Sequence, residues 1–106
     1  MAWEIAAHAA AEKELDEQPA DIRAKLDRLV SLIKTFGLER IPAKYAQHLQ
    51  GELWEFRLIG KDGIARALYV TRHGQRIVIV RAFTKKTQKT PRREIKIALQ
   101  RAKDIP

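Results

Sequence analysis

The sequence predicts a single α+β domain, residues 1–106, in which a helical hairpin packs on a small, curved, mainly antiparallel sheet. Three observations lead to this fold class. The first third of the chain has helical composition and spacing, the middle holds three consecutive strand-like runs, and the last residues return to helical spacing. The 106 residues amount to about one domain, and 45% of them are apolar, which is enough for one core.

The first predicted elements are a short strand and two helices. Residues 3–6 form the strand candidate, and residues 8–17 favour a helix because they are rich in alanine. Pro19 suits the first turn of a second helix, whose leucines and isoleucines recur at near-helical spacing, and Gly37 is a typical helix stop. The pair predicts a helical hairpin with one buried face.

The predicted strands follow consecutively after a loop at 41–50. They span 53–58, 64–70 and 76–83, with turns at 60–63 and 73–74. The last of them is apolar on both faces, which predicts a central position in the sheet. Thr90 and Pro91 are then the expected N-cap and first residue of a final helix. The predicted order is β-α-α-β-β-β-α.

The positive charge is concentrated in the second part of the chain. The chain has 21 Lys and Arg against 13 Asp and Glu, a formal net charge of +8. Residues 1–36 carry a net −2 and residues 37–106 a net +10, and Arg72–Lys103 holds 11 basic residues but one acidic residue. Such asymmetry is typical of proteins that bind nucleic acid, although a solvated surface is the alternative.

Composition excludes several other kinds of site. The absence of cysteine excludes a disulfide scaffold, a thiolate metal site and a cysteine nucleophile. The three histidines fall in different elements without ligand spacing, so we expect no metal, and no motif indicates a cofactor. No apolar run approaches the roughly 18 residues of a membrane helix, and no signal peptide is evident, so we expect a cytoplasmic protein without membrane contact.

The candidate functional residues are basic. Arg57 and Arg66 lie on adjacent predicted strands beside large apolar residues, where a charge is costly unless it faces a partner or an open groove. Arg81 interrupts an apolar run, and Lys85 and Lys86 follow the third strand directly. If the strands are neighbours, these groups converge on one concave face, and such a cluster suits phosphate.

An ordinary structural reading of the two arginines stays open. Arg57 then pairs with Glu55 or Glu52, and Arg66 pairs across the hairpin.

Three segments of the sequence resemble the phage-derived HigB-type toxins of the RelE/ParE toxin superfamily. Residues 48–57 resemble the segment hL-x-G-x-LWELR, and residues 63–69 resemble the strand G-x-x-R-x-x-Y. Residues 83–95 are similar to the signature F-x-KKTxKTPxxEI, followed by Ala98. The order and spacing of all three agree, so the resemblance spans essentially the whole chain and implies a RelE-like fold.

The resemblance also implies an activity. Such toxins belong to type II toxin–antitoxin systems and are usually metal-independent endoribonucleases that cleave mRNA at the ribosome, through attack of a ribose 2′-hydroxyl on the adjacent phosphate. By position, the catalytic groove would contain Arg57, Arg66, Lys85 and Lys86. Further basic residues in or near the motifs are expected to bind RNA: Lys44, Arg81, Lys89, Arg92 and Arg93. The implied partners are mRNA, the ribosome and a cognate helix-turn-helix antitoxin of the HigA type.

The general acid and base are not assigned by this resemblance. Several relatives carry a terminal Tyr or His for this purpose, and this chain ends Lys103-Asp104-Ile105-Pro106 with neither. Glu55 and Glu94 are the carboxylates nearest the motifs, although Glu94 also suits the first turn of the last helix. Two alternative functions remain, a ParE-like inhibitor of DNA gyrase and a non-catalytic nucleic-acid-binding module.

Overall fold

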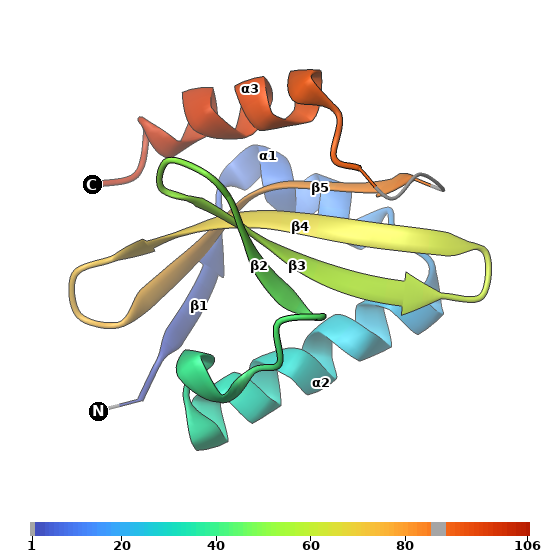
Figure 1. Cartoon of the computed structure of the whole chain (residues 1–106), viewed down its shortest axis with the longest axis horizontal. Helices are drawn as coiled ribbons and strands as arrows, with labels where there is room; N and C mark the ends of the chain where they lie inside the picture. Colours follow the sequence, from blue (N-terminus) through green and yellow to red (C-terminus); the bar gives the residue numbers. More distant parts are fainter. Residues whose placement is uncertain (1, 86–88) are drawn as a thin grey trace.

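The computed structural model describes residues 2–85 and 89–106, which form a five-stranded mixed sheet with helices on both faces (Figure 1). The elements follow in the order β1 (Glu4–Ala7), α1 (Ala9–Asp16), α2 (Ala20–Phe36), η1 (Leu38–Arg40), β2 (Ala46–Gln50), β3 (Leu53–Gly60), β4 (Gly63–Arg72), β5 (Arg76–Lys85) and α3 (Arg92–Ala102). In the sheet the strand order is β1-β5-β4-β3-β2. Strand β1 runs parallel to β5, and the other neighbours are antiparallel. The predicted α+β class is confirmed.

One segment of the predicted loop is a strand. Residues 46–50 form β2, which pairs with β3 from Ala46 opposite Phe56 to His48 opposite Trp54, and the register shifts before Gln50. The sequence AQHLQ is mostly polar and exposed, so it lacks the alternation of a half-buried strand. Pairing with the apolar neighbour β3 orders this edge strand, and the loop prediction for it was wrong.

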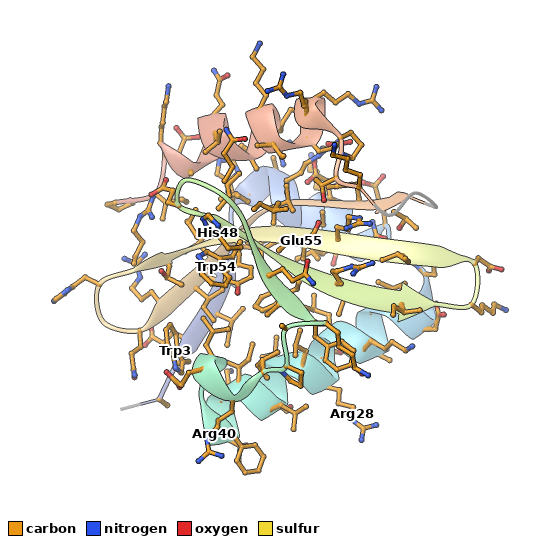
Figure 2. The ribbon with its side chains drawn as sticks, in the orientation of Figure 1. Trp3, Arg28, Arg40, His48, Trp54 and Glu55 are labelled. Carbon is orange, nitrogen blue, oxygen red and sulfur yellow. The ribbon has the colours of Figure 1, made fainter. Side chains whose placement is uncertain are left out.

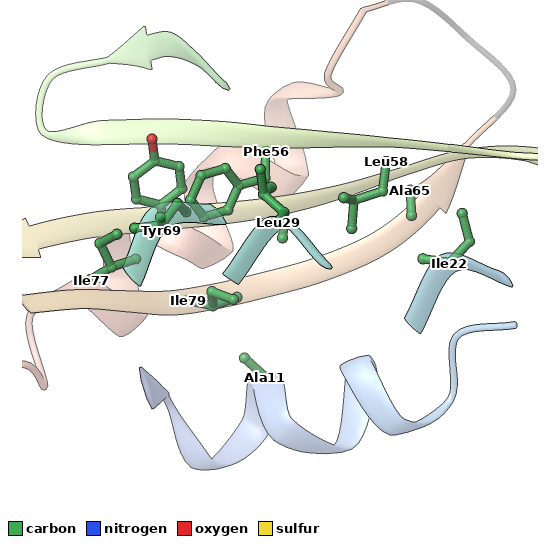
Figure 3. Close-up of a cluster of buried hydrophobic side chains, with 11 residues drawn as sticks. Ala11, Ile22, Leu29, Phe56, Leu58, Ala65, Tyr69, Ile77 and Ile79 are labelled. Atoms are coloured by element: carbon green, nitrogen blue, oxygen red, sulfur yellow. The ribbon is translucent and has the colours of Figure 1, made fainter. Parts of the chain in front are cut away.

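The two faces of the sheet are covered by different helices. Helices α1 and α2 pack on one face, over Phe56, Tyr69 and Ile79, whereas α3 packs on the other, over Leu68 and Val80 (Figures 1 and 3). Phe56 and Tyr69 stack at 3.9 Å between ring centroids. The predicted helical hairpin is thus confirmed, and its buried face is the one that lies on the sheet.

Strand β5 has the central position that its sequence predicts. It lies between β1 and β4. Ile77 and Ile79 belong to the core under α1 and α2, and Val78 and Val80 belong to the core under α3. A strand segment covered on both faces needs apolar residues at successive positions, which explains the run from Ile77 to Val80.

The last helix begins later than the sequence predicts. Its N-cap is Pro91 rather than Thr90, and no side chain caps its first turn. The Thr90 hydroxyl instead donates a hydrogen bond to Oε1 of Glu55 on β3. The Thr90 side chain, which local preference would use to cap the helix, is therefore engaged in a tertiary contact with Glu55.

Candidate active site

Arg57 and Arg66 lie directly opposite each other on β3 and β4. Gly60 pairs with Gly63 across the two-residue loop Lys61–Asp62, and this tight hairpin sets the register that brings the two arginines together. Phe83 of β5 is the next residue in the row, opposite Arg66. Paired residues share a face of the sheet, and Arg66 and Phe83 lie on the face that carries α3. The predicted convergence of Arg57 and Arg66 is therefore present.

A buried carboxylate holds one of these arginines. Nη1 of Arg66 lies 3.1 Å from both Oε1 and Oε2 of Glu55, and both side chains are 2% exposed. The same Nη1 lies 3.4 Å from Oγ1 of Thr90, whose hydroxyl donates to Glu55. Glu55 lies in the middle of the sheet in Figure 2. The cluster of Glu55, Arg66 and Thr90 connects the segment before α3 to β3 and β4. Arg66 therefore pairs across the hairpin, as the structural alternative expected.

The two arginines consequently differ in access to solvent. Arg57 is half-buried and lines a groove at the open edge of β3, whereas Arg66 lies beneath Glu55 and Thr90. Arg57, Arg66 and Phe83 form a row across β3, β4 and β5, called the arginine row here. Lys85 ends β5 with its Cα opposite Ile64, two residues along the strand from Phe83. The side chain of Lys85 and the whole of Lys86 lie outside the described residues.

The first turn of α3 forms a basic surface beside β2. Arg92 and Arg93 are exposed and, with Lys96, line a hollow of about 320 Å³ whose opposite wall is Gln50. Lys89, just before the helix, is also exposed. Lys96 was not among the predicted RNA-binding residues. Lys96 lies four residues after Arg92 and three after Arg93, and this helical spacing indicates that all three share a face of α3.

Arg81 belongs to a charged network between helices on opposite faces of the sheet. Its guanidinium donates to Glu14 of α1 and, at 2.6 Å, to Glu94 of α3, which is 3% exposed. Burial alone would lower the pKa of Arg81, but the hydrogen bond and charge of Glu94 and the charge of Glu14 together raise it. Glu14 also accepts from Arg101 at 2.8 and 2.9 Å. The network joins α1, β5 and α3, which gives Arg81 a structural role. Its RNA-binding role stays a prediction.

The predicted RNA-binding residue Lys44 precedes Tyr45, whose backbone is hydrogen-bonded to that of Arg57. Its ammonium lies 4.9 Å from the centroid of the Tyr45 ring. The Tyr45 carbonyl accepts a hydrogen bond from the Arg57 backbone N–H at 2.9 Å. Two further cations near Arg57, Lys25 and Arg28 of α2, were not predicted, because they belong to the part of the chain with a net negative charge.

Tyr69 lies away from the arginine row. It belongs to the core under α1 and α2 and is 1% exposed, and burial raises the pKa of its hydroxyl. Among the described residues, no group of three or more His, Asp or Glu side chains is arranged to hold a metal ion. The helices within these residues are all too short or too polar to span a membrane.

Comparisons with known proteins agree with this fold. Residues 13–103 match the family described as phage-derived protein Gp49-like (DUF891). No curated protein sequence matches the chain significantly.

Two solved structures are similar across most of the chain. The E. coli toxin RelE, in the free state and with two arginine-to-alanine substitutions, has a TM-score of 0.66 and 16% identity over 100% of both chains. A chain of the archaeal RelE–RelB complex from Pyrococcus horikoshii has a TM-score of 0.55 and 17% identity, over 84% of this chain and 100% of that chain. At these identities the likeness shows a common fold. The chain belongs to the phage-derived Gp49-like family, and its fold is that of the RelE toxins.

Proposed function

We propose that this chain is the toxin of a type II toxin–antitoxin system and a metal-independent endoribonuclease that cleaves mRNA at the ribosome. The RelE fold and the family match support a toxin of this kind. The observation that carries the proposal is the arginine row. Arg57 and Arg66 face each other on adjacent strands, and the exposed Arg92 and Arg93 begin a helix on the same side of the sheet. This arrangement suits an RNA backbone, since planar guanidinium groups match phosphate oxygens.

The proposed reaction is an internal displacement within RNA. The ribose 2′-hydroxyl gives up its proton as its oxygen forms a bond to the adjacent phosphorus. The bond from phosphorus to the 5′-oxygen breaks, and the departing oxygen takes up a proton. Negative charge on the phosphate oxygens grows in the transition state, so a cation aimed at them accelerates the step. Arg57, half-buried at the open edge of β3, is more accessible to such a phosphate than Arg66, which lies opposite it.

Arg66 contributes differently in this proposal. Its Nη1 is engaged by Glu55 and Thr90, so RNA reaches it only by displacing these partners. While they stay in place, Arg66 neutralises the Glu55 carboxylate, which would otherwise repel the incoming phosphate. Arg66 thereby keeps the field around Arg57 positive.

The remaining basic residues are assigned to binding and proton transfer. Lys85 and Lys86 hold the phosphate or assist proton transfer, as the motif in which they lie suggests. Lys89, Arg92 and Arg93 would track the RNA backbone along the start of α3, and Lys44 would contact it near Arg57. This assignment extends the basic surface along one side of the molecule.

No general base is assigned. Glu94 is engaged by Arg81, and Glu55 by Arg66 and Thr90, so the two carboxylates nearest the motifs both have structural partners. A site poor in bases is consistent with RNA that is positioned, and partly activated, by the ribosome. The antitoxin proposed as partner is a helix-turn-helix protein of the HigA type.

Expression of the wild-type chain in growing cells tests the proposal, with mRNA ends mapped and DNA damage measured in the same culture. We expect growth arrest and cuts in translated reading frames. Arg57→Ala should lower cleavage about 10²- to 10³-fold, the effect of removing one donor to a developing oxyanion. Arg40→Ala is the matched control, since Arg40 is an exposed cation distant from Glu55 in Figure 2.

Three results would contradict the assignment. Full cleavage by folded Arg57→Ala would remove Arg57 from the site. DNA damage without mRNA cleavage would indicate a gyrase inhibitor. Tight, salt-sensitive RNA binding without cleavage would indicate a binding module.

A further inference from the structure

A groove of about 560 Å³ lies between α2 and the end of β3. Its floor contains the buried Leu29 and Leu58. Its rims carry Leu32 and Ile59, which are 41% and 49% exposed although both are large and apolar. Exposed apolar side chains that flank a hollow indicate a binding surface more strongly than scattered ones do.

The same groove exposes an open strand edge. Strand β2 pairs with β3 no further than Phe56, and the Arg57 N–H donates to the Tyr45 carbonyl just beyond β2. Because backbone groups alternate in direction along a strand, the N–H and C=O of Ile59 point to the same edge as those of Arg57. Within the described residues, no strand pairs with this edge at Ile59, and its carbonyl accepts a hydrogen bond from the Lys25 ammonium.

The charged side chains described along the groove are all positive. Among its described lining residues, the ionised groups are the cations of Lys25, Arg28 and Arg57. Figure 2 shows Arg28 extending outward from α2. An occupant must therefore offer anionic groups, apolar groups and, at the edge of β3, backbone donors and acceptors.

We propose that this groove binds an extended segment of the antitoxin, in which carboxylates alternate with apolar side chains. The segment adds a short strand along the outer edge of β3, places its apolar side chains against Leu32 and Ile59, and directs its carboxylates to Arg28 and Arg57. A nucleic acid fits less well, because it cannot continue the ladder of a β-strand. The inference rests on the proposed toxin function and adds to it that the antitoxin covers Arg57 directly.

The test uses the protein encoded by the reading frame next to the gene as the probe. Purified wild-type chain is titrated with it by calorimetry, and the two are also co-expressed to measure rescue of growth. The key variants are Arg28→Glu and Leu32→Glu, because both residues lie in the groove and outside the proposed catalytic machinery. Lys34→Glu is the matched control, an exposed cation on another side of α2 with the same change of charge.

We expect Arg28→Glu and Leu32→Glu to weaken probe binding at least tenfold, and whatever growth arrest they retain to escape rescue. Lys34→Glu should behave as the wild type. In the complex with the wild type, hydrogen exchange of the Ile59 amide should slow at least tenfold, which an occupant without a strand would not cause.

Other outcomes separate the two proposals. Unchanged binding by both groove variants would overturn the docking site, and so would a probe that does not bind a toxic wild-type chain. A wild-type chain that arrests no growth would overturn the toxin function. Calorimetry and exchange at Ile59 would still decide whether the groove is occupied in that case.

Discussion

Arg57 and Arg66 stand opposite each other on β3 and β4, and Glu55, on the same face of β3, accepts two hydrogen bonds from Arg66 at 3.1 Å. Like charges directly opposite in a sheet destabilise it, and a buried charge is costly without a partner. Glu55 offsets both costs. The opposite charge of Glu55 therefore helps two positive charges to stay side by side in this sheet.

Replacing Glu55 tests this dependence. Glu55→Gln keeps the shape of the side chain but leaves Arg66 buried without its counter-charge, so we expect the free energy of unfolding to fall by about 3 to 5 kcal/mol. Urea denaturation followed by circular dichroism measures the loss. Glu52→Gln is the control, because Glu52 pairs with Arg72 at the surface and its side chain is 50% exposed. A change of about 0 to 1 kcal/mol is expected there, and equal losses in both variants would contradict the role given to Glu55.

Acid should loosen the network that joins α1, β5 and α3. Burial alone would raise the pKa of Glu14, but hydrogen bonds from Arg101 and the Ala82 backbone, with the charges of both arginines, hold it below its usual 4.5. A carboxyl group with a lowered pKa in the folded state stabilises the protein above its unfolded-state pKa, and this contribution is lost as the pH falls through the folded value.

We therefore expect the free energy of unfolding to decline as the pH falls below about 5, through the usual carboxyl pKa and then through the lowered one. Glu14→Gln should be less stable at neutral pH and should flatten this decline, as measured by urea denaturation at a series of pH values. Glu12→Gln, an exposed carboxylate on the same helix, is the control. A decline of the same steepness in Glu14→Gln and the wild type would exclude Glu14 as a source of it.

The register of the arginine row could be predicted because its cause is local. A two-residue loop between Gly60 and Gly63 leaves one pairing for β3 and β4, and the apolar alternation of both strands agrees with it. The apolar run from Ile77 to Val80 predicted the central position of β5 for a similar reason. Patterns within a few residues were sufficient in both cases.

The strand β2 and the burial of Arg66 depend on distant residues and could not be predicted in this way. Residues 46–50 are polar, and β3 alone makes them a strand. Arg66 is buried by Glu55 and by Thr90, which lies 24 residues further along the chain. Local preference assigned Thr90 to a helix cap, and only the folded sheet shows that it contacts Glu55 instead.

Tyr69 provides a test of which face of the sheet carries the chemistry. Its ring stacks on Phe56 beneath α1 and α2, and burial raises the pKa of its hydroxyl. Tyr69→Phe should therefore keep full mRNA cleavage and growth arrest, because the substitution preserves the stacked ring and removes a group from the face opposite α3. A 100-fold loss of cleavage in a folded Tyr69→Phe variant would place the reaction on the α1–α2 face.

The basic start of α3 predicts a salt dependence that can be measured without cleavage. Each phosphate contact on single-stranded RNA contributes about 0.7 to the slope of log K against log salt. If Arg92 and Arg93 each neutralise one phosphate, the double variant Arg92→Ala/Arg93→Ala should lower the steepness by about 1.4, measured by fluorescence anisotropy with a labelled oligouridylate. Lys34→Ala/Arg40→Ala removes the same charge from exposed positions at the end of α2 and in η1, and should leave the slope unchanged. Because both double variants reduce the net charge equally, a slope that drops in both would assign the effect to overall charge, whereas a drop in the α3 variant alone would locate the RNA on α3.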